Sequence, residues 1–362
     1  MATSKSTPNL GLSNKYDTIQ VFRFIAALMV IILHSMYYTS ERLAPGFPLF
    51  SRGSNGVDLF FVISGFVMIL STQNLKDKPG GWRTFAIRRI IRIVPIYWIL
   101  TTYKLFVLLF ASSLVYHASV DVSYITKSYF FIPATNVDGV LGPLLGVGWT
   151  LNFEMFFYAL FALTLALRKN TILFLSIIFI PLAFLSSFRT INWPDVRFYA
   201  NTIVLNFLYG MIAAKLILTG KKLSNALSFT IIFMGLGYLF IPGIPENKVD
   251  NLIVGIASFF IVYGGASIEN VYGPKMPASL VWLGSASYSL YLVHPIIAPL
   301  TPFLLKTLKL QWPWISVTLS ILIAVIAGSV FYRFCEQPIT KYLTKRSKKR
   351  ELELTPQPVN KE

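Results

Sequence analysis

Arg23 and His34 are the two residues whose types and spacing most directly indicate chemistry. Both lie in the apolar segment 18–38, TIQVFRFIAALMVIILHSMYY. Eleven helical steps amount to three turns plus roughly 20°, so both side chains leave the same face of a helix, about 16–17 Å apart along its axis. Charged and titratable side chains are costly inside a membrane, where they usually face a water-filled cavity and mark a site. The pair therefore predicts a functional site along this segment.

The chemistry suited to this pair is recognition of an anion at one end and proton transfer at the other. Arginine binds phosphate through a planar fork of donors, and imidazole is a general base near neutral pH. The spacing fits an extended ligand such as a coenzyme A thioester. The structural alternative makes Arg23 an interfacial anchor and His34 a packed polar residue.

Asp58 is a candidate partner for the imidazole. It lies near the start of the apolar segment 56–73, which begins GVDLFFVISGF. A carboxylate is favoured there by the helix dipole alone. The functional alternative is that Asp58 meets His34, orients its ring and raises its basicity. Ser64 and Gly65, further along the segment, predict close approach of another helix.

Glu154 is the second candidate carboxylate, in the segment 148–167. A carboxylate within an apolar helix should face the bundle interior and have a partner there. One interpretation places it level with His34, in a catalytic role. The other is a structural ion pair with Arg23 or Lys104.

Arg88, Arg89 and Arg92 form a basic cluster in the run WRTFAIRRIIRIVPIYW, residues 82–98. Arg88 and Arg92 are four residues apart and are expected to share one helical face, with Arg89 on the adjacent one. Such a cluster at a membrane boundary is typical of contacts with lipid headgroups. It also suits a phosphate clamp for a nucleotide-like donor, together with Arg23. Both interpretations remain open at this point.

Four further residues are candidates for binding an acceptor or supporting the site. Trp149 and Asn152 precede Glu154 and offer a stacking face and hydrogen bonds for a sugar. Tyr288 and His294 lie in a later apolar segment, SYSLYLVHP. For His294 a structural role is also expected, because kinked membrane helices use polar groups to satisfy freed backbone carbonyls.

These residues must be positioned by membrane helices. The chain has 362 residues, of which 55% are hydrophobic and 13% charged, whereas a soluble domain carries about 25% charged residues. The mean hydropathy is +0.63. We therefore predict an all-α, polytopic membrane bundle. With about 20 apolar residues needed for a span, ten segments qualify: 18–38, 56–73, 93–115, 148–167, 171–188, 199–219, 226–241, 251–268, 280–304 and 312–334.

Basic residues set the orientation and the domain plan. The net charge is +17, but the Lys and Arg residues cluster in short loops beside apolar segments, which indicates topology and not nucleic-acid binding. Their distribution predicts that both termini are cytoplasmic. The plan is a cytoplasmic segment 1–17, a ten-helix membrane domain 18–342 and a charged, disordered tail 343–362.

Cysteine and histidine usage predicts neither a disulfide framework nor a metal site. Cys335 is the single cysteine in the sequence and cannot pair within the chain. The three histidines form no HExxH pattern, so no metal or permanently bound cofactor is expected.

The ordered motifs resemble the acyltransferase family three membrane proteins. The resemblance rests on Arg-x10-His in the first segment, GVDLFFVISGF, an Arg-rich run ending in Pro-x-Tyr, WTLNFEMFFY, SYSLYLVHP and a final Glu-x-Pro, over about residues 16–342. It implies essential roles for Arg23, His34, Arg89 and Arg92, and points to Glu154. It also implies a stand-alone form, without a fused esterase-like domain.

The resemblance further implies transfer of an acyl group, chiefly acetyl, from cytoplasmic acyl-CoA to a hydroxyl of a surface glycan, an exopolysaccharide or a lipid-linked precursor. The expected location is the bacterial inner membrane, and the expected partners are the acyl-CoA, the carbohydrate acceptor, membrane lipids and polysaccharide assembly proteins. Direct transfer and a covalent acyl-histidine relay remain open. So do two other functions, a flippase of lipid-linked glycans and a membrane sensor or scaffold.

Overall fold

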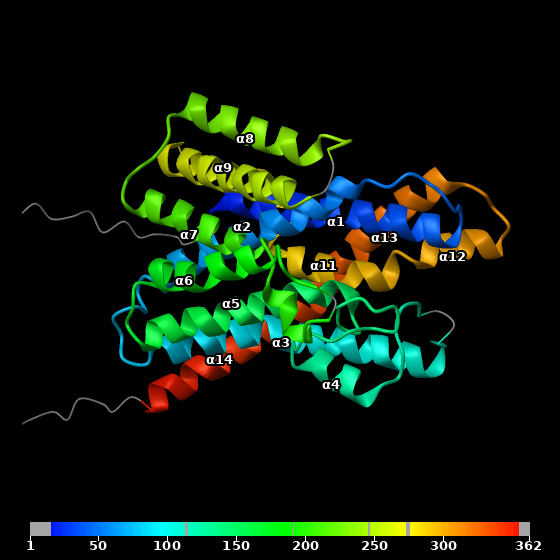
Figure 1. Ribbon diagram of the computed structural model, residues 1–362, viewed down its shortest axis with the longest axis horizontal. Helices are drawn as coiled ribbons and strands as arrows, with labels where there is room; N and C mark the ends of the chain where they lie inside the picture. The colour runs from blue at the N-terminus through cyan, green and yellow to red at the C-terminus, as the bar shows by residue number, and fades with distance from the viewer. Residues whose placement is uncertain (1–15, 113–114, 191, 245–246, 273–275, 355–362) are drawn as a thin grey trace, which may run out of the picture.

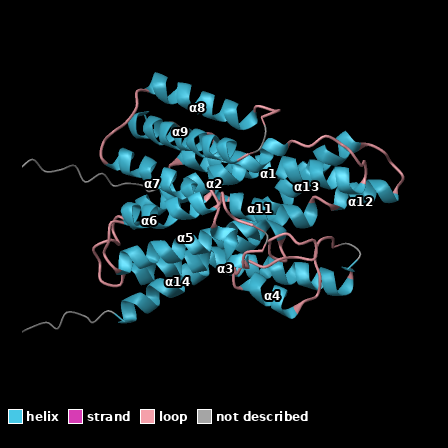
Figure 2. Ribbon diagram, in the orientation of Figure 1, coloured by secondary structure: helices cyan, strands magenta, loops and turns pink. Residues whose placement is uncertain are grey.

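The computed structural model describes residues 16–112, 115–190, 192–244, 247–272 and 276–354. The described chain is a bundle of helices that run roughly along the long axis of the molecule (Figures 1 and 2). Its α-helices are α1 (Asp17–Arg42), α2 (Asn55–Thr72), α3 (Gly81–Phe110), α4 (Val122–Tyr129), α5 (Trp149–Ala166), α6 (Thr171–Leu185), α7 (Val204–Leu218), α8 (Asn225–Phe240), α9 (Lys248–Tyr272), α10 (Ala278–Ser285), α11 (Ser287–Ile297), α12 (Leu300–Thr307), α13 (Pro313–Phe331) and α14 (Gln337–Leu354).

Seven described helices or helical runs are long and apolar enough to cross a membrane. Three shorter apolar helices, α6, α7 and α8, accompany them. The prediction of a polytopic membrane bundle is therefore confirmed. The seven long elements and three short ones fall on the ten predicted segments, although several boundaries differ, including the two described next.

The first difference is at α3, which begins at Gly81 and not near residue 93. The arginine-rich run is thus continuous with the apolar helix that follows it, and Gly80, with φ of 75°, provides the left-handed turn before it. The second is at the predicted span 280–304, which the structure divides into α10, α11 and α12. Pro295 and Pro299 lie near the second break, where proline removes a backbone donor.

Helix α1 lies at the centre of the bundle and contacts α2, α9, α10, α11 and α13. Its close approach to α10 depends on Gly284, where a Cβ would collide with the backbone carbonyl of Gln20. The start of α1 is capped by Glu269 of α9, whose carboxylate accepts hydrogen bonds from the backbone amides of Asp17, at 2.6 Å, and Thr18, at 2.9 Å. The first-turn amides of a helix have no partner within it, so this carboxylate satisfies them.

Helices α2 and α7 pack closely through two glycines. A Cβ at Gly65 would meet the Phe207 carbonyl, and one at Gly210 would meet the Val62 carbonyl. The close approach predicted at Gly65 is thus confirmed. Because α2 lines the cavity described below, this contact holds one of its walls in place.

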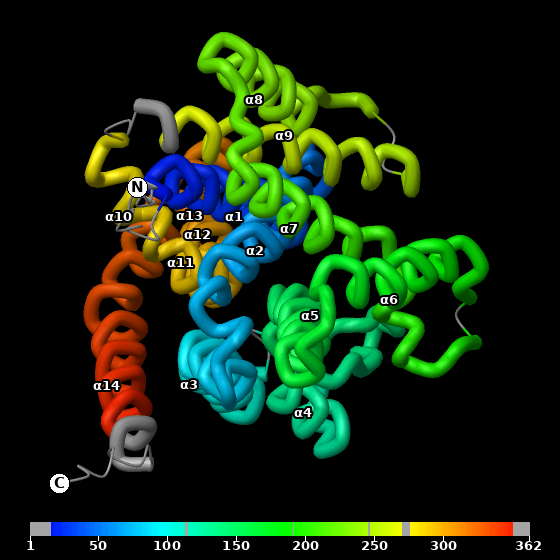
Figure 3. The backbone as a smooth tube through the Cα atoms, turned by 90° about the vertical axis from the view of Figure 1, so that its left-hand side faces the viewer, coloured from blue at the N-terminus to red at the C-terminus, as the bar shows by residue number. Residues whose placement is uncertain are grey.

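The two ends of the bundle differ in character. Figure 3 looks onto the end at which α1 begins and α14 leaves the bundle beside α3. Helix α14 runs to Leu354, so residues 343–354 are helical and the expected disorder does not hold for them. Residues 355–362 of that expected tail and residues 1–15 of the predicted segment 1–17 lie outside the described residues.

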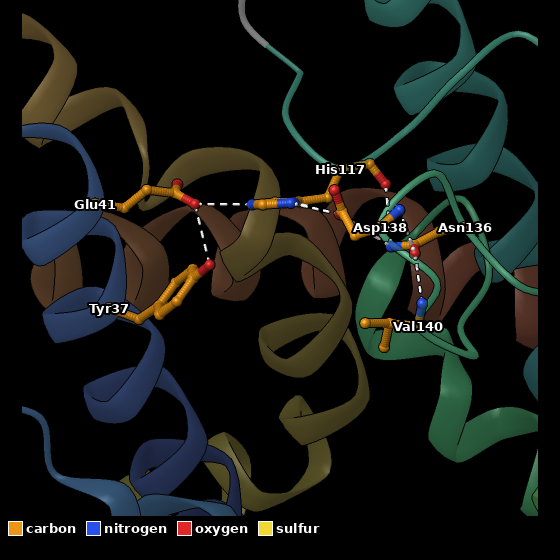
Figure 4. Close-up of polar contacts among 6 residues, drawn as sticks. All are labelled: Tyr37, Glu41, His117, Asn136, Asp138 and Val140. Carbon is orange, nitrogen blue, oxygen red and sulfur yellow. Dashed lines mark hydrogen bonds and ion pairs between the residues drawn. The ribbon is translucent and has the colours of Figure 1, made fainter. Parts of the chain in front are cut away.

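At the opposite end, His117 joins the loop before α4 to the end of α1 (Figure 4). One ring nitrogen lies 2.9 Å from Glu41 and the other lies 2.6 Å from Asp138. Carboxylates only accept hydrogen bonds, so this geometry fits an imidazolium, in which both ring nitrogens donate. The hydrogen bond to Glu41 and the proximity of Asp138 raise the pKa of His117 above its ordinary value.

Candidate active site

A cavity of about 250 Å³ lies among α1, α2, α3, α5 and α11. Cations line one part of its wall, and the rest is lined by hydroxyl, aromatic and aliphatic side chains together with Glu154. The polar lining residues are Tyr16, Gln20, Arg23, Ser64, Ser71, Arg89, Arg92, Thr150, Glu154, Tyr158, Ser287, Tyr288 and Tyr291. The arrangement suits an elongated ligand with an anionic end.

Arg23, Arg89 and Arg92 all reach this cavity. Arg23 donates a hydrogen bond to Gln20 at 3.1 Å, one turn earlier on α1. The Arg89 guanidinium lies 5.6 Å from the Phe85 ring centre and 5.9 Å from that of Tyr158, within the range of a cation–π interaction. Three guanidinium groups thus line one cavity, and guanidinium is a side chain suited to binding phosphate.

Arg88 is placed differently from its neighbours. It is exposed on α3, between the exposed Ile87 and the half-buried Arg89, and it is not among the cavity residues. The prediction grouped Arg88 and Arg92 on one face by their spacing of four. Spacings of three and four both keep two residues on one helical face, so spacing alone could not decide which pair is buried. In the structure it is Arg89 and Arg92, three residues apart, that face the bundle.

Glu154 also lines the cavity. Its electrostatic neighbours are Arg92, Arg23 and Arg89, although no ion pair within 4.0 Å joins it to them in the described part of the chain. The alternative partner Lys104 lies elsewhere, near Arg42 and Glu41. Glu154 therefore balances the cationic part of the cavity and does not pair with Lys104.

Glu336 was not among the predicted site residues, yet its charge acts on Arg23. It is buried and accepts a hydrogen bond from the Ser289 hydroxyl at 2.5 Å. It ends the π-helical turn Tyr332–Glu336 that joins α13 to α14, a kind of turn that is frequent at functional sites. The Glu-x-Pro pattern was the signal available in the sequence. Because this pattern follows the last apolar segment, the sequence did not indicate that Glu336 is buried.

His34 and His294 form a pair, with 3.0 Å between His34 Nδ1 and His294 Nε2. The second nitrogen of His294, Nδ1, lies 3.3 Å from the Leu290 carbonyl. A carbonyl only accepts, so His294 Nδ1 carries a proton, and in the neutral ring His294 Nε2 then accepts from His34 Nδ1–H. This series of hydrogen bonds leaves the lone pair of the neutral His34 ring on Nε2. His294 is fully buried, whereas His34 is partly exposed.

Asp58 does not meet His34. The carboxylate accepts a hydrogen bond at 2.7 Å from the Asn206 amide of α7, near the buried ion pair of Arg52 and Asp250. The expected partner of the imidazole is thus replaced by His294, from a helix that sequence spacing could not place beside α1.

Tyr288 and Tyr291 line the cavity from α11. Tyr288 donates to the Ile93 carbonyl at 2.8 Å, and Tyr291 to the Val147 carbonyl at 3.2 Å. The Tyr291 ring centre lies 5.8 Å from that of His294, so Tyr291 borders both the cavity and His294, which does not itself line the cavity.

Trp149 and Asn152 lie outside the cavity lining. Trp149 packs against the aromatic rings of Phe153 and Phe198. Asn152 is buried, and neither amide atom has a hydrogen-bond partner. Trp149 is therefore part of the aromatic packing around α5, and neither residue lines the cavity.

Comparisons with known proteins identify the family. The profile of the acyltransferase-3 family, described as an acyltransferase domain, matches residues 16–334. The exopolysaccharide production protein ExoZ of Rhizobium meliloti (strain 1021) is 30% identical over 297 residues, which cover 81% of this chain and 91% of ExoZ. No solved structure matches the chain.

Two larger relatives are similar over part of their length. The O-acetyltransferase OatA of Staphylococcus aureus (strain NCTC 8325 / PS 47) is 26% identical over 80% of this chain and 53% of OatA. The peptidoglycan O-acetyltransferase OatA of Listeria monocytogenes is 28% identical over 91% of this chain and 56% of that protein. The chain thus spans about half of each OatA protein. The chain belongs to the acyltransferase-3 family and is a multi-pass membrane O-acyltransferase.

Proposed function

We propose that this enzyme moves an acetyl group from cytoplasmic acyl-CoA to a hydroxyl of a surface glycan, an exopolysaccharide or its lipid-linked precursor. The observation that carries the proposal is the cavity that extends from Arg23 and Arg92 to Tyr291, the neighbour of the histidine pair. A donor bound there has its phosphates at the arginines and its thioester toward His34. The names of ExoZ and OatA, which refer to exopolysaccharide production and O-acetylation, support the acceptor class.

The proposed topology has ten membrane crossings in the bacterial inner membrane, with both termini cytoplasmic. Helix α1 begins and α14 projects at the same end of the bundle (Figure 1). The lysines of α14, the lysines of the loop before α3 and the arginines in the first turns of α3 gather there, in accord with the positive-inside rule. The cationic part of the cavity then opens to the compartment that supplies acyl-CoA.

The catalytic step follows from the tautomer of His34. Its free Nε2 removes the proton from the acceptor hydroxyl as that oxygen attacks the thioester carbonyl. The new C–O bond forms, the C–S bond breaks, and the imidazolium returns its proton to the departing CoA thiolate. His294 is a positioning residue, because its Nε2 accepts from His34 Nδ1–H and stabilises the imidazolium. In a covalent route the same Nε2 attacks the thioester first.

The test uses purified protein and acetyl-CoA labelled in the acetyl group, with CoA release and acceptor labelling as readouts. A general base typically contributes about 10²–10⁴-fold, so His34→Ala should lower acetyl transfer by that factor while the protein still inserts. His117→Ala, at the loop histidine, is the matched control and should retain transfer. Transfer by His34→Ala at the rate of the control would refute the role of His34.

The same assay separates the other functions. A flippase would move an unmodified glycan without consuming acetyl-CoA, and a scaffold would release no CoA at all. Trapping the protein after brief reaction, followed by mass analysis, distinguishes the two chemical routes. A gain of one acetyl group on the His34 peptide indicates the covalent relay, and an unmodified peptide indicates direct transfer.

A further inference from the structure

A second cavity, of about 630 Å³, lies at the end of the bundle where α1 begins. It shares Gln20, Arg23 and Arg92 with the first cavity. These common residues form the boundary between a narrow inner space and a wider, more open one. A ligand longer than the inner cavity therefore extends into the second.

One face of α14 forms a wall of this outer cavity. Lys341, Lys345 and Lys348 line it, at spacings of four and three that place them along one helical face. Thr340 and Thr344 add hydroxyl groups to the same wall. Arg346 and Lys349 are exposed as well but are not among the lining residues, so the helix presents two separate sets of cations.

The charge of the outer cavity is strongly unbalanced. Among the described lining residues, Arg23, Arg92 and the three lysines are cationic, and Glu336 is the one carboxylate. Glu336 is buried and accepts from Ser289 at 2.5 Å, whereas the lysines are exposed. Across the residues that the structure describes, no ion pair within 4.0 Å joins these lysines to a carboxylate, and their charge attracts an anion into the open space.

Chemical types change in order along the two cavities. Hydroxyl and aromatic groups lie near His294, guanidinium groups lie at the junction, and ammonium groups lie at the outer mouth. Guanidinium groups bind phosphate in bidentate fashion, whereas ammonium groups act as point charges on flexible stems. The order matches a thioester with an uncharged arm, a diphosphate and a further, separate phosphate.

We propose that Lys341, Lys345 and Lys348 of α14 bind the 3′-phosphate at the nucleotide end of the acyl-CoA. The inference rests on the proposed function, since it assigns a further part of the same donor. It concerns residues beyond 334, where the match to the family profile ends. The phosphate chemistry is shared with lipid headgroups, so the experiment must separate the two sources.

The test compares two donors, acetyl-CoA and acetyl-3′-dephospho-CoA, with protein in nanodiscs of zwitterionic lipid. The variant K345Q/K348Q removes two lysines of the lining, and R346Q/K349Q removes two cations of the same helix outside it. Exposed charge pairs contribute modestly, so K345Q/K348Q should raise KM for acetyl-CoA by about 5- to 20-fold with kcat unchanged. KM for the dephospho donor should stay at its wild-type value.

The control R346Q/K349Q should behave as the wild type with both donors. Equal increases in KM for both donors, or none for acetyl-CoA, would overturn the assignment of the 3′-phosphate. A defect that appears only in anionic lipid, and equally with both donors, would assign the lysines to lipid headgroups instead.

A binding measurement separates this inference from the proposed function. The affinity for CoA itself, against that for 3′-dephospho-CoA, is measured by calorimetry on the wild type and on K345Q/K348Q. If the protein binds CoA more tightly than 3′-dephospho-CoA, loses this preference in K345Q/K348Q and releases no CoA from acetyl-CoA, the phosphate site is upheld and the transferase proposal is refuted. CoA release without that preference would do the reverse.

Discussion

At the scale of single residues, the site is defined by which side chains the fold turns inward. Arg23 and His34 were predicted to be site residues from their spacing on one helix. In the structure Arg23 lines the cavity and His34 contacts His294. Spacing within a helix depends on local geometry that the sequence states directly. Local geometry does not determine which other helix faces a given residue. For this reason Asp58 was expected beside His34, and its actual partner Asn206 was not expected.

The contrast between Arg92 and Arg88 can be tested in one helix. Arg92→Gln should raise KM for acetyl-CoA by about 10- to 100-fold, as expected when a hydrogen bond to a charged group worth about 1.5–3 kcal/mol is lost. Arg88→Gln removes the same charge from the exposed side of α3 and should change KM little. Steady-state kinetics of CoA release measure both, and a larger effect at Arg88 would favour the grouping predicted from sequence.

At the scale of elements, glycine contacts set the walls of the cavity. Helix α2 carries Ser64 into the lining, and its position depends on the contact of Gly210 with the Val62 carbonyl. Helix α11 carries Tyr288, Tyr291 and His294. It is a separate element, because the helix predicted over 280–304 is interrupted on either side of it. Local composition predicted that a helix would occur there but not where it would break.

Gly210→Ala should destabilise the protein by about 1–3 kcal/mol, because the added Cβ collides with backbone that cannot move alone. The control is Gly237→Ala in α8, where a Cβ would meet nothing within 4 Å, and where alanine favours the helix by up to about 1 kcal/mol. Thermal unfolding in detergent compares the two variants. Equal midpoints would contradict the close packing of α2 and α7.

At the scale of the whole molecule, apolar length and charge placement predicted the class of protein and the approximate position of every apolar helix. These features depend on the membrane as solvent, which acts on each segment separately. The histidine pair, the partner of Asp58 and the depth of Glu336 depend on contacts between segments far apart in sequence. A single sequence holds no direct record of such contacts, so the structure was needed to find them.

The bridge at His117 predicts that stability depends on pH. The pKa of His117 is raised in the folded protein, first by the hydrogen bond to Glu41, so protonation favours folding. Its contribution is fully present below the ordinary value of 6.5 and is lost as pH rises through the raised pKa. Tyr37 and Arg42 also contact Glu41.

The measurement compares unfolding of the wild type and His117→Asn between pH 5.5 and 8.5, values chosen to bracket the ordinary histidine pKa of about 6.5. Asparagine tolerates the positive φ of 63° at this position. The wild type should be more stable by about 0.2–1 kcal/mol at the acid end, as expected for exposed pairs, and the difference should vanish at the alkaline end. A difference that is constant with pH would exclude the imidazolium.

The cap of α1 by Glu269 has a consequence for biosynthesis. The two ends of that contact are 252 residues apart in the chain. At about 5–20 residues per second, the ribosome makes Glu269 roughly 12–50 s after Asp17. Helix α1, which carries Arg23 and His34, therefore enters the membrane long before its final cap exists. The start of α1 can therefore be capped only after most of the chain has been made and α9 has arrived beside α1.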